Sequence, residues 1–289
     1  MARVPGMDER FGAFPRALAE RTRTVRLAGV PALIAHPDWK TPAPVMVWMH
    51  GRTVSKELDP GRYLRWVRAG IAAVALDLPG HGERFEAALQ KPEGTLDVLE
   101  RMLGEVDAVT DALAAREYGD VLDVGRMGIG GMSAGGMVAL RRLCEGHEFV
   151  CAAVEGTTGW LEGLYLSGGR TPWGATHDPA RVRALDAMSR LGGWRPIPLL
   201  ALHSRGDEVV PVSTQERFVE AVRARCVEAG ADPGMVRLRT WERTGAPWEH
   251  AGFGVVANDA KNEQLGFLRR WLVGGKEAAD GDAVPEVRG

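Results

Sequence analysis

Short apolar runs alternate with longer amphipathic segments along most of the chain. Each apolar run is bounded by glycine, proline or polar residues, which is typical of strands, and several contain β-branched side chains. The segments between the runs place apolar residues at helical spacing. The expected strands are residues 24–30 with a hairpin partner at 31–35, then 45–49, 71–76, 126–130, 149–154, 198–203 and 236–241. The expected helices are residues 16–21, 56–69, 96–118, 137–143, 213–229 and 258–273.

The alternation of strand and helix with short connectors favours a parallel sheet with helices on both faces. We therefore expect an α/β fold in which residues 1–289 form one domain around a mostly parallel sheet of about eight strands. The core is expected at residues 24–273, after an N-terminal extension at 1–23. The tail at 274–289 is rich in Gly, Ala, Asp and Glu and is expected to be disordered.

One long connection interrupts this rhythm. Residues 157–195 contain several aromatic side chains among glycines, including Trp160, Tyr165 and Trp173. A connection of this length in a compact domain is usually functional, and it leaves the edge of the sheet where ligands bind. We expect a small lid insertion whose three aromatic residues contact substrate, together with Trp248 from a later loop. The alternative is a helix and loop that simply pack on the core.

Composition and charge exclude several classes of function. The chain is 45% hydrophobic and 26% charged, and its 36 basic and 38 acidic side chains give a net charge of −2. This balance gives no electrostatic footprint for nucleic acid or for an anionic membrane surface. The N-terminus lacks the apolar core of a signal peptide, and no apolar run approaches the ~20 residues that span a bilayer. We therefore expect a cytoplasmic protein without membrane insertion.

The three cysteines show no metal-ligand spacing. Cys144, Cys151 and Cys226 lie in apolar or helical surroundings, without a second Cys or a His at zinc-finger spacing. We expect buried, inert thiols in a reducing compartment, and neither a metal nor a cofactor.

A serine between two glycines provides the candidate chemistry. Gly131-Met132-Ser133-Ala134-Gly135 lies between an expected strand and an expected helix, as a nucleophile elbow requires. The chain must reverse sharply at Ser133, and a side chain at position 131 or 135 would collide with the neighbouring strand or helix. The alternative is a glycine-rich turn with a capping serine.

A serine hydroxyl needs a base, and the base needs an orienting carboxylate. Asp207 directly follows the expected strand at 198–203, and His250 lies in the loop after the strand at 236–241. Both loops would open at the same edge of the sheet as Ser133, so we expect His250 as the base and Asp207 as the acid. Glu208 and Glu155 remain alternatives for the acid, because each also follows a strand.

Attack on a carbonyl also requires two backbone N–H donors for the oxyanion. The N–H of Ala134, at the start of the helix after the nucleophile, is expected to be one donor. The N–H of Arg52, in the turn after the strand at 45–49, is expected to be the other. The Arg52 side chain is expected to be solvated at the surface, with binding of an acidic substrate group as the alternative.

With these residues in place, the chain resembles the α/β-hydrolase superfamily from Thr24 to Val273. The order Ser133, Asp207, His250 is the order of that superfamily. The turn at 50–57, the Pro-Gly-His-Gly turn at 77–84 and the elbow resemble small bacterial esterases grouped with dienelactone hydrolases and prolyl oligopeptidase-like hydrolases. The serine replaces the cysteine nucleophile of dienelactone hydrolases, so lactone specificity is not implied. The segment before Thr24 is too short for the propeller of prolyl oligopeptidases, which disfavours peptidase activity.

The resemblance implies cofactor-free acyl transfer to water. We expect a carboxylesterase that cleaves small to medium acyl esters through an acyl-enzyme on Ser133, with a small-molecule ester as its partner. A thioesterase or amidase with the same triad is the alternative, and a binding protein without turnover is a third. Exposed tryptophans in the lid are equally consistent with a homodimer contact.

Overall fold

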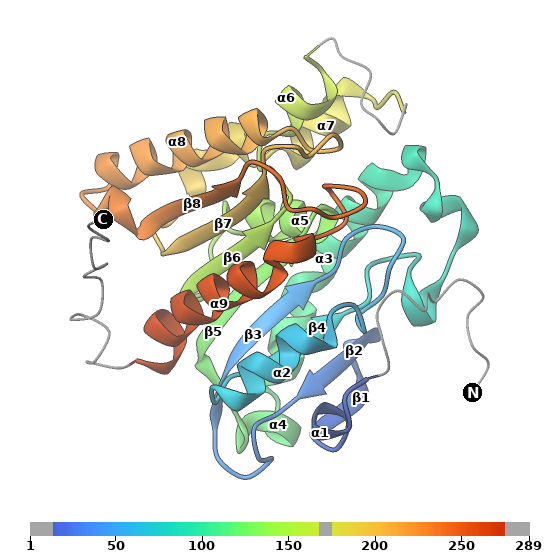
Figure 1. The fold of residues 1–289 in the computed structure, drawn as a ribbon, viewed down its shortest axis with the longest axis vertical. Coiled ribbons are helices and arrows are strands. Elements are labelled where there is room, and N and C mark those ends of the chain that lie inside the picture. Colours follow the sequence, from blue (N-terminus) through green and yellow to red (C-terminus); the bar gives the residue numbers. More distant parts are fainter. Residues whose placement is uncertain (1–13, 168–174, 275–289) are drawn as a thin grey trace, which may run out of the picture.

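The computed structural model describes residues 14–167 and 175–274, which contain an eight-stranded sheet flanked by helices (Figure 1). The strands are β1 Thr22–Leu27, β2 Val30–Ala35, β3 Ala43–Met49, β4 Ala72–Leu76, β5 Leu122–Met132, β6 Cys151–Glu155, β7 Leu199–Ser204 and β8 Val236–Trp241. Their order in the sheet is β1-β2-β4-β3-β5-β6-β7-β8. The pairs β1–β2 and β2–β4 are antiparallel, and all other neighbours are parallel. The expected α/β fold with a mostly parallel sheet is confirmed.

The helices follow the expected order with shifted ends. Within the described residues they are α1 Arg16–Ala19, α2 Pro60–Arg68, α3 Thr95–Ala114, α4 Arg116–Gly119, α5 Ala134–Arg142, α6 Leu161–Tyr165, α7 Pro179–Leu185, α8 Val212–Glu228 and α9 Ala257–Leu268. The helix expected from residue 56 begins at Pro60, a residue that suits the first helical position. The helix expected over 96–118 breaks at Ala115, which is extended with φ −63° and ψ 154°. The last expected helix continues beyond Leu268 as a π-helical turn to Val273.

Alternate side chains of the strands pack against two layers of helices. On β3, Val45 and Val47 join a core cluster with residues of α3, α5 and α8, whereas Trp48 faces the opposite side of the sheet. On that side it meets Trp66 of α2 and the cluster that contains Phe267 of α9. Figure 1 shows α2 and α9 together on this face. Both faces of β3 are therefore buried, as its continuous apolar run predicts.

The long connection after β6 packs on the main core in its described part. It forms α6, α7 and a 3₁₀ turn over Met188–Gly193. Its inward side chains belong to the same core cluster as α3 and α5; they are Leu161, Leu164, Val182, Leu185, Ala187 and Trp194. This packing favours the alternative of a helix and loop on the core, and the lid remains a prediction. Trp173, like the expected tail from residue 275 onward, lies outside the described residues.

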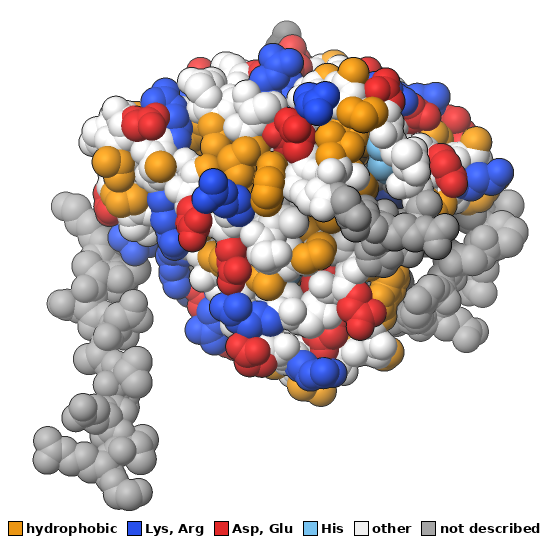
Figure 2. Space-filling model, turned by 90° about the horizontal axis from the view of Figure 1, so that it is seen from above, with side chains coloured by type: hydrophobic (Ala, Val, Ile, Leu, Met, Phe, Trp, Pro, Cys, Tyr) orange, Lys and Arg blue, Asp and Glu red, His pale blue; other side chains and the backbone are white. Residues whose placement is uncertain are grey.

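The surface carries mixed charges, and the cysteines are buried, as expected. In Figure 2 basic and acidic side chains are interspersed over the face shown. All three cysteines are free and buried, and burial raises the pKa of Cys144 and Cys151 to about 12. None of the described helices is both long and apolar enough to cross a membrane. Over the same residues, no three His, Cys, Asp or Glu side chains gather in a group that could hold a metal ion.

Candidate active site

Ser133 occupies a strained turn between β5 and α5. Strand β5 ends at Met132 and helix α5 begins at Ala134, so a single residue with φ 50° and ψ −118° joins them. A positive φ is uncommon for a residue with a side chain and often marks a functional site. A Cβ at Gly131 would lie 2.5 Å from the carbonyl oxygen of Met49, and a Cβ at Gly135 would lie 2.2 Å from the same atom. Both glycines are therefore required, as the elbow pattern predicts.

The structure brings Ser133, His250 and Asp207 into one hydrogen-bonded chain. The Ser133 Oγ lies 2.9 Å from His250 Nε2, and His250 Nδ1 lies 2.8 Å from Asp207 Oδ2. An ionised carboxylate can only accept hydrogen bonds, so Nδ1 carries the proton and donates it. The lone pair of Nε2 then faces the serine hydroxyl. Both His250 and Asp207 are buried, which strengthens these contacts.

Backbone amides and a second histidine hold the Asp207 carboxylate. Its Oδ1 accepts hydrogen bonds from the amides of Val209 at 2.9 Å and Val210 at 2.8 Å. Its Oδ2 also lies 3.5 Å from His203 Nε2. Burial alone would raise the pKa of Asp207, but the contacts with His203 and His250 outweigh it and hold this pKa well below its usual range. The carboxylate is therefore ionised at neutral pH.

The two alternative acids have other surroundings. The Glu208 side chain is exposed to solvent, although it directly follows Asp207. The carboxylate of Glu155 is buried at the end of β6, where it is paired with Arg62 and accepts a hydrogen bond from Gln264. Of the three candidate acids, Asp207 is the one hydrogen-bonded to His250.

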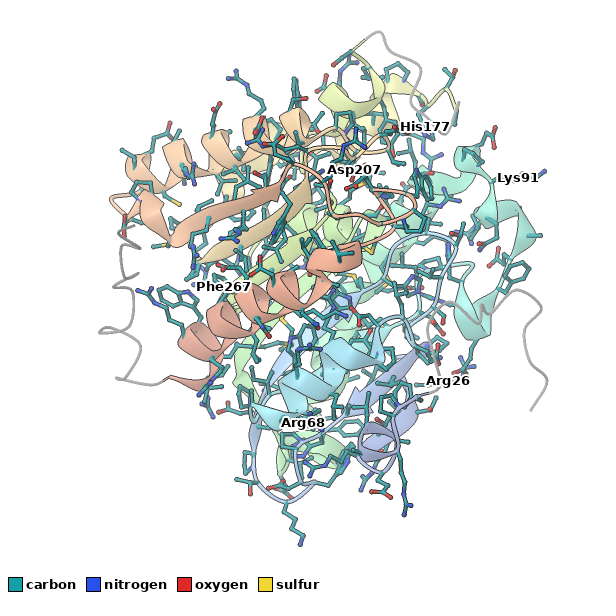
Figure 3. All side chains as sticks on the ribbon, viewed as in Figure 1. Arg26, Arg68, Lys91, His177, Asp207 and Phe267 are labelled. Atoms are coloured by element: carbon teal, nitrogen blue, oxygen red, sulfur yellow. The ribbon has the colours of Figure 1, made fainter. Side chains whose placement is uncertain are left out.

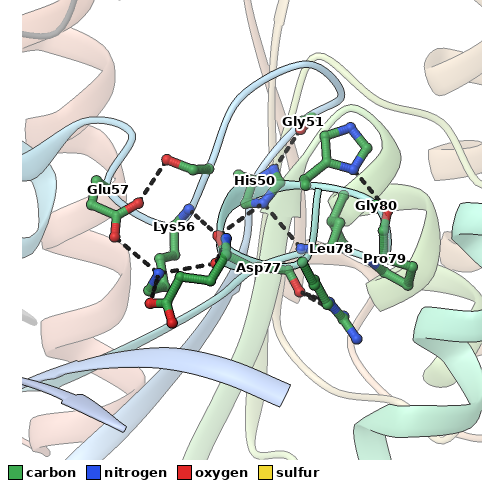
Figure 4. Close-up of polar contacts among 12 residues, drawn as sticks. His50, Gly51, Lys56, Glu57, Asp77, Leu78, Pro79 and Gly80 are labelled. Atoms are coloured by element: carbon green, nitrogen blue, oxygen red, sulfur yellow. Dashed lines mark hydrogen bonds and ion pairs between the residues drawn. The ribbon is translucent and has the colours of Figure 1, made fainter. Parts of the chain in front are cut away.

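The turn after β3 is held by His50 (Figure 4). The amide of Leu78 donates a 3.0 Å hydrogen bond to His50 Nε2, so His50 Nδ1 carries the ring proton and donates to the carbonyl oxygen of Gly51. Burial lowers the pKa of His50 to about 4, which keeps the ring neutral. The peptide bond from Gly51 to Arg52 is trans, so the Arg52 N–H points away from the carbonyl held by His50.

Both expected oxyanion donors lie beside the serine. A Cβ on Gly51 would come within 3.4 Å of the Ser133 Cβ, so the turn that carries the Arg52 amide packs directly on the elbow. Ala134 is the first residue of α5, where backbone N–H groups have no acceptor within the helix. Arg52, Ser133 and Ala134 line one cavity.

The Arg52 side chain differs from the expected solvated arginine. Its guanidinium donates to the carbonyl oxygens of Leu89 at 2.6 Å and Lys91 at 2.7 Å, and also to the hydroxyl of Thr95. Leu89 and Lys91 belong to the segment between β4 and α3, and Thr95 is the first residue of α3. The side chain therefore fastens that segment to the turn after β3. The sequence could not show this, because the acceptors are mostly backbone atoms.

A buried ion cluster supports the same turn and was missed by sequence reasoning. The Lys56 side chain is buried, and its Nζ lies 2.9 Å from Asp77 Oδ2, 2.7 Å from Glu83 Oε1 and 2.9 Å from Glu57 Oε1 (Figure 4). Burial alone would lower the pKa of Lys56, but the carboxylates raise it above its ordinary value. The cluster ties the segment after the His50–Arg52 turn to the turn after β4.

Glu249 anchors the loop that carries His250 and was also missed. Its carboxylate accepts hydrogen bonds from the amide of Thr244 at 2.9 Å, from the Thr244 hydroxyl at 2.8 Å and from the Ser204 hydroxyl. Burial opposes ionisation, but these donors outweigh it and lower the pKa of Glu249. The loop is thus fixed one residue before His250. The signal available in the sequence was that Glu249, an acidic residue, directly precedes His250.

A narrow cavity of about 30 Å³ lies beside the serine. Most of its lining is apolar and comes from α5, α6 and the loop after β7; the residues are Arg52, Thr95, Ser133, Ala134, Met137, Leu164, Tyr165, His177, Val209 and Val210. Figure 3 shows His177 near α7 and Asp207 at the end of β7. Tyr165, one of the residues expected to contact substrate, is part of this lining, and the contact remains a prediction.

The other aromatic residues expected at the substrate have different places. Trp160 is partly buried and packs against the main core. Trp248 is 44% exposed, and its ring centroid lies 5.9 Å from that of His250 in an edge-on arrangement. Trp173 lies outside the described residues.

Comparisons with known proteins place the chain in a family. The sequence model of the prolyl oligopeptidase family matches residues 62–240, more than half of the chain. Esterase YjfP of Escherichia coli (strain K12) is 27% identical over 207 residues, which cover 68% of this chain and 82% of that protein.

Two solved structures share the architecture. TT1662 from Thermus thermophilus superposes with a TM-score of 0.68 and 23% identity, covering 87% of this chain and 98% of its own. The Pyrococcus furiosus esterase PF2001 superposes with a TM-score of 0.66 and 17% identity, covering 91% of this chain and 95% of its own. At these identities the likeness shows the α/β-hydrolase fold.

Proposed function

Because this chain belongs to the prolyl oligopeptidase family and is a serine hydrolase, of the esterase or peptidase kind, we propose that it is a carboxylesterase for small acyl esters. The observation that carries the proposal is the hydrogen-bonded chain from Ser133 through His250 to Asp207 at the strained elbow. The similarity to esterase YjfP supports an ester as the substrate.

The proposed reaction has two acyl-transfer steps. The Ser133 oxygen attacks the ester carbonyl carbon while its proton moves to His250 Nε2, and Asp207 stabilises the imidazolium that forms. The N–H groups of Arg52 and Ala134 stabilise the negative oxygen of the tetrahedral intermediate. The imidazolium then protonates the leaving alcohol, which leaves an acyl-enzyme. Water repeats the sequence, with His250 as its base, and releases the carboxylic acid and the free serine.

The cavity beside the serine is assigned to the acyl group. The leaving oxygen must reach His250 Nε2 to take its proton, whereas the cavity is lined by Ser133 and Ala134 without His250. Pockets for drug-sized ligands occupy about 300–1,000 Å³, far more than the 30 Å³ found here. Leu164 and Tyr165 lie in its wall. These dimensions favour short acyl chains.

Thioesters and amides remain as alternatives within the same chemistry, because the triad does not define the leaving group. A matched panel of butyryl substrates, consisting of a p-nitrophenyl ester, a thioester and an anilide, separates the three. Membership of a serine hydrolase family disfavours the third expectation, a binding protein without turnover.

The direct test compares wild type with Ser133→Ala on this panel. We expect the ester to be cleaved fastest, and Ser133→Ala to lose this activity while it keeps the wild-type melting temperature. Ser213→Ala, which changes an exposed serine of α8, is the matched control and should retain full activity. Retention of ester hydrolysis by Ser133→Ala would contradict the proposal, and faster cleavage of the thioester or anilide would replace the substrate class.

A further inference from the structure

A second carboxylate is buried next to the elbow at the end of β6. The backbone carbonyl of Glu155 accepts the Ser133 amide at 2.9 Å, and its side chain is 2% exposed. Arg62 of α2 donates to both carboxylate oxygens, with Nη2 at 2.7 Å from Oε2, and Gln264 of α9 donates to Oε1 at 3.0 Å. This bidentate pair is the strongest geometry for an Arg–carboxylate contact.

The pair belongs to a network whose charges cancel. Arg62 Nη2 also lies 3.2 Å from Asp59 Oδ2, and Lys261 Nζ lies 2.7 Å from Asp59 Oδ1. Two carboxylates thus face two cations, with Gln264 as a neutral member. The network joins α2, which follows the turn after β3, to α9, which follows the His250 loop.

This network approaches the back of the His250–Asp207 pair. Glu155, Asp207 and His250 line a common cavity of about 10 Å³, roughly the space of one water molecule. A Cβ on Gly156, the residue after Glu155, would lie 3.6 Å from Asp207 Oδ2 and 3.8 Å from His250 Nδ1. In such a buried setting, an unbalanced charge on the network would act on the imidazole with little screening.

We propose that Arg62 and Glu155 are positioning residues, and that Arg62 cancels the charge that Glu155 would otherwise add to the electrostatic environment of His250. The proposal rests on the proposed function, in which His250 is the base. Because Arg62 cancels its charge, the Glu155 carboxylate does not compete with Asp207 for the imidazole. It also does not stabilise the imidazolium of His250 beyond what Asp207 provides. The pair also fixes the helices that follow the two catalytic loops.

The groups that face His250 come from four elements. They are Asp207 after β7, Glu155 at the end of β6, Ser133 at the elbow, and Glu249 and Trp248 in the loop of His250 itself. Farther from the imidazole, His203 lies beside Asp207, and Arg62 pairs with Glu155 and with Asp59, which also pairs with Lys261. The Glu249 carboxylate accepts hydrogen bonds from Ser204 and Thr244. Because neither Arg62 nor Glu155 is among these donors, substitutions at positions 62 and 155 leave them in place.

The proposal predicts shifts of opposite sign. Glu155→Gln leaves the network with one excess positive charge, which disfavours the imidazolium of His250. The acid limb of the pH profile of kcat/KM, where His250 becomes protonated, therefore moves to lower pH by roughly half a unit or more. Arg62→Met leaves one excess negative charge and moves the limb to higher pH. The double variant Arg62→Met/Glu155→Gln restores neutrality and should return the limb to its wild-type position. A purely structural role does not produce this reversal.

The experiment measures kcat/KM for p-nitrophenyl butyrate from about pH 5 to 9, where histidine titrates. Glu105→Gln is the control, since Glu105 forms a similar bidentate pair with Arg84, at 2.8 Å for both contacts, and lines none of these cavities. Melting temperatures identify variants that merely lose stability. An unchanged acid limb in both single variants, or shifts of the same sign, would overturn the proposal even if activity falls.

A second measurement keeps the test independent of turnover. The pKa of His250 is read by NMR from its imidazole signal, assigned with His250→Gln, in wild type, Glu155→Gln and the double variant. We expect a lower pKa in Glu155→Gln and recovery in the double variant. An equal pKa in all three overturns the proposal. If the wild type cleaves no ester, the proposed function fails, and this titration still decides the role of the pair.

Discussion

Asp207→Asn is expected to disable the base through the tautomer of His250. The two backbone amides at Val209 and Val210 donate to Oδ1, so the asparagine must keep its carbonyl oxygen there. Its NH₂ group then faces His250 Nδ1 and donates to it. The ring proton is forced onto Nε2, which can no longer accept the proton of Ser133. We expect kcat to fall about 10⁴-fold, equivalent to about 5 kcal/mol of transition-state stabilisation.

The assay is the initial rate of p-nitrophenyl butyrate hydrolysis under saturating substrate. Asp232→Asn is the matched control, because Asp232 accepts the Gly234 amide at 2.8 Å in an exposed turn and should lose no activity. The thermal unfolding transition of both variants is recorded to exclude loss of fold. A loss smaller than about tenfold in Asp207→Asn would refute the reasoning, since the wrong tautomer removes the base altogether.

Three further predictions concern packing and acid stability. Gly135→Ala places a Cβ 2.2 Å from the Met49 carbonyl oxygen and should lower the free energy of unfolding by about 1–3 kcal/mol and abolish turnover. The control Gly104→Ala in α3, where a Cβ meets nothing within 4 Å, should raise the free energy of unfolding by about 0.5–1 kcal/mol. Equal denaturation curves for the two variants would contradict this prediction. Leu164→Ala enlarges the cavity beside Ser133 that is proposed to hold the acyl group, so the ratio of octanoyl to butyryl ester hydrolysis should rise. A constant ratio would show that the acyl group does not occupy this cavity. Because the folded-state pKa of Asp207 is depressed, the stabilising contribution of its carboxylate is present above about pH 4 and is lost as the pH falls through that pKa. The difference in melting temperature between wild type and Asp207→Asn should therefore narrow on acidification. A difference that does not depend on pH would contradict this prediction.

The sheet and the elbow could be predicted because their signals are local. Continuous apolar runs mark the buried parallel strands, and β8 has the expected bounds of Val236–Trp241. The glycines around Ser133 are dictated by contacts of the backbone itself, so the sequence pattern carries the geometry. The positions of Asp207 and His250 follow from topology, because loops after parallel strands open at one edge of the sheet.

The electrostatic framework around the site could not be predicted in this way. Lys56 meets Asp77 across 21 positions, and Arg62 meets Glu155 across 93 positions, so no local pattern links the partners. A charged residue in a helical segment is ordinarily exposed, which is why the buried Arg62 was not noticed. The side chain of Arg52, in a turn, was expected in solvent because arginine is ordinarily exposed. Such pairings depend on tertiary distances, which spacing along the chain does not encode.

We propose that Ser133 is the nucleophile of a serine esterase. The most direct measurement is intact-protein mass spectrometry after fluorophosphonate labelling, followed by mapping of the adduct, with Ser133→Ala and Ser213→Ala in parallel. We expect one adduct on Ser133 in wild type and in Ser213→Ala, none in Ser133→Ala, and loss of ester hydrolysis in proportion to labelling. An adduct on another residue, or unlabelled protein that still hydrolyses the ester after treatment, would contradict the proposal.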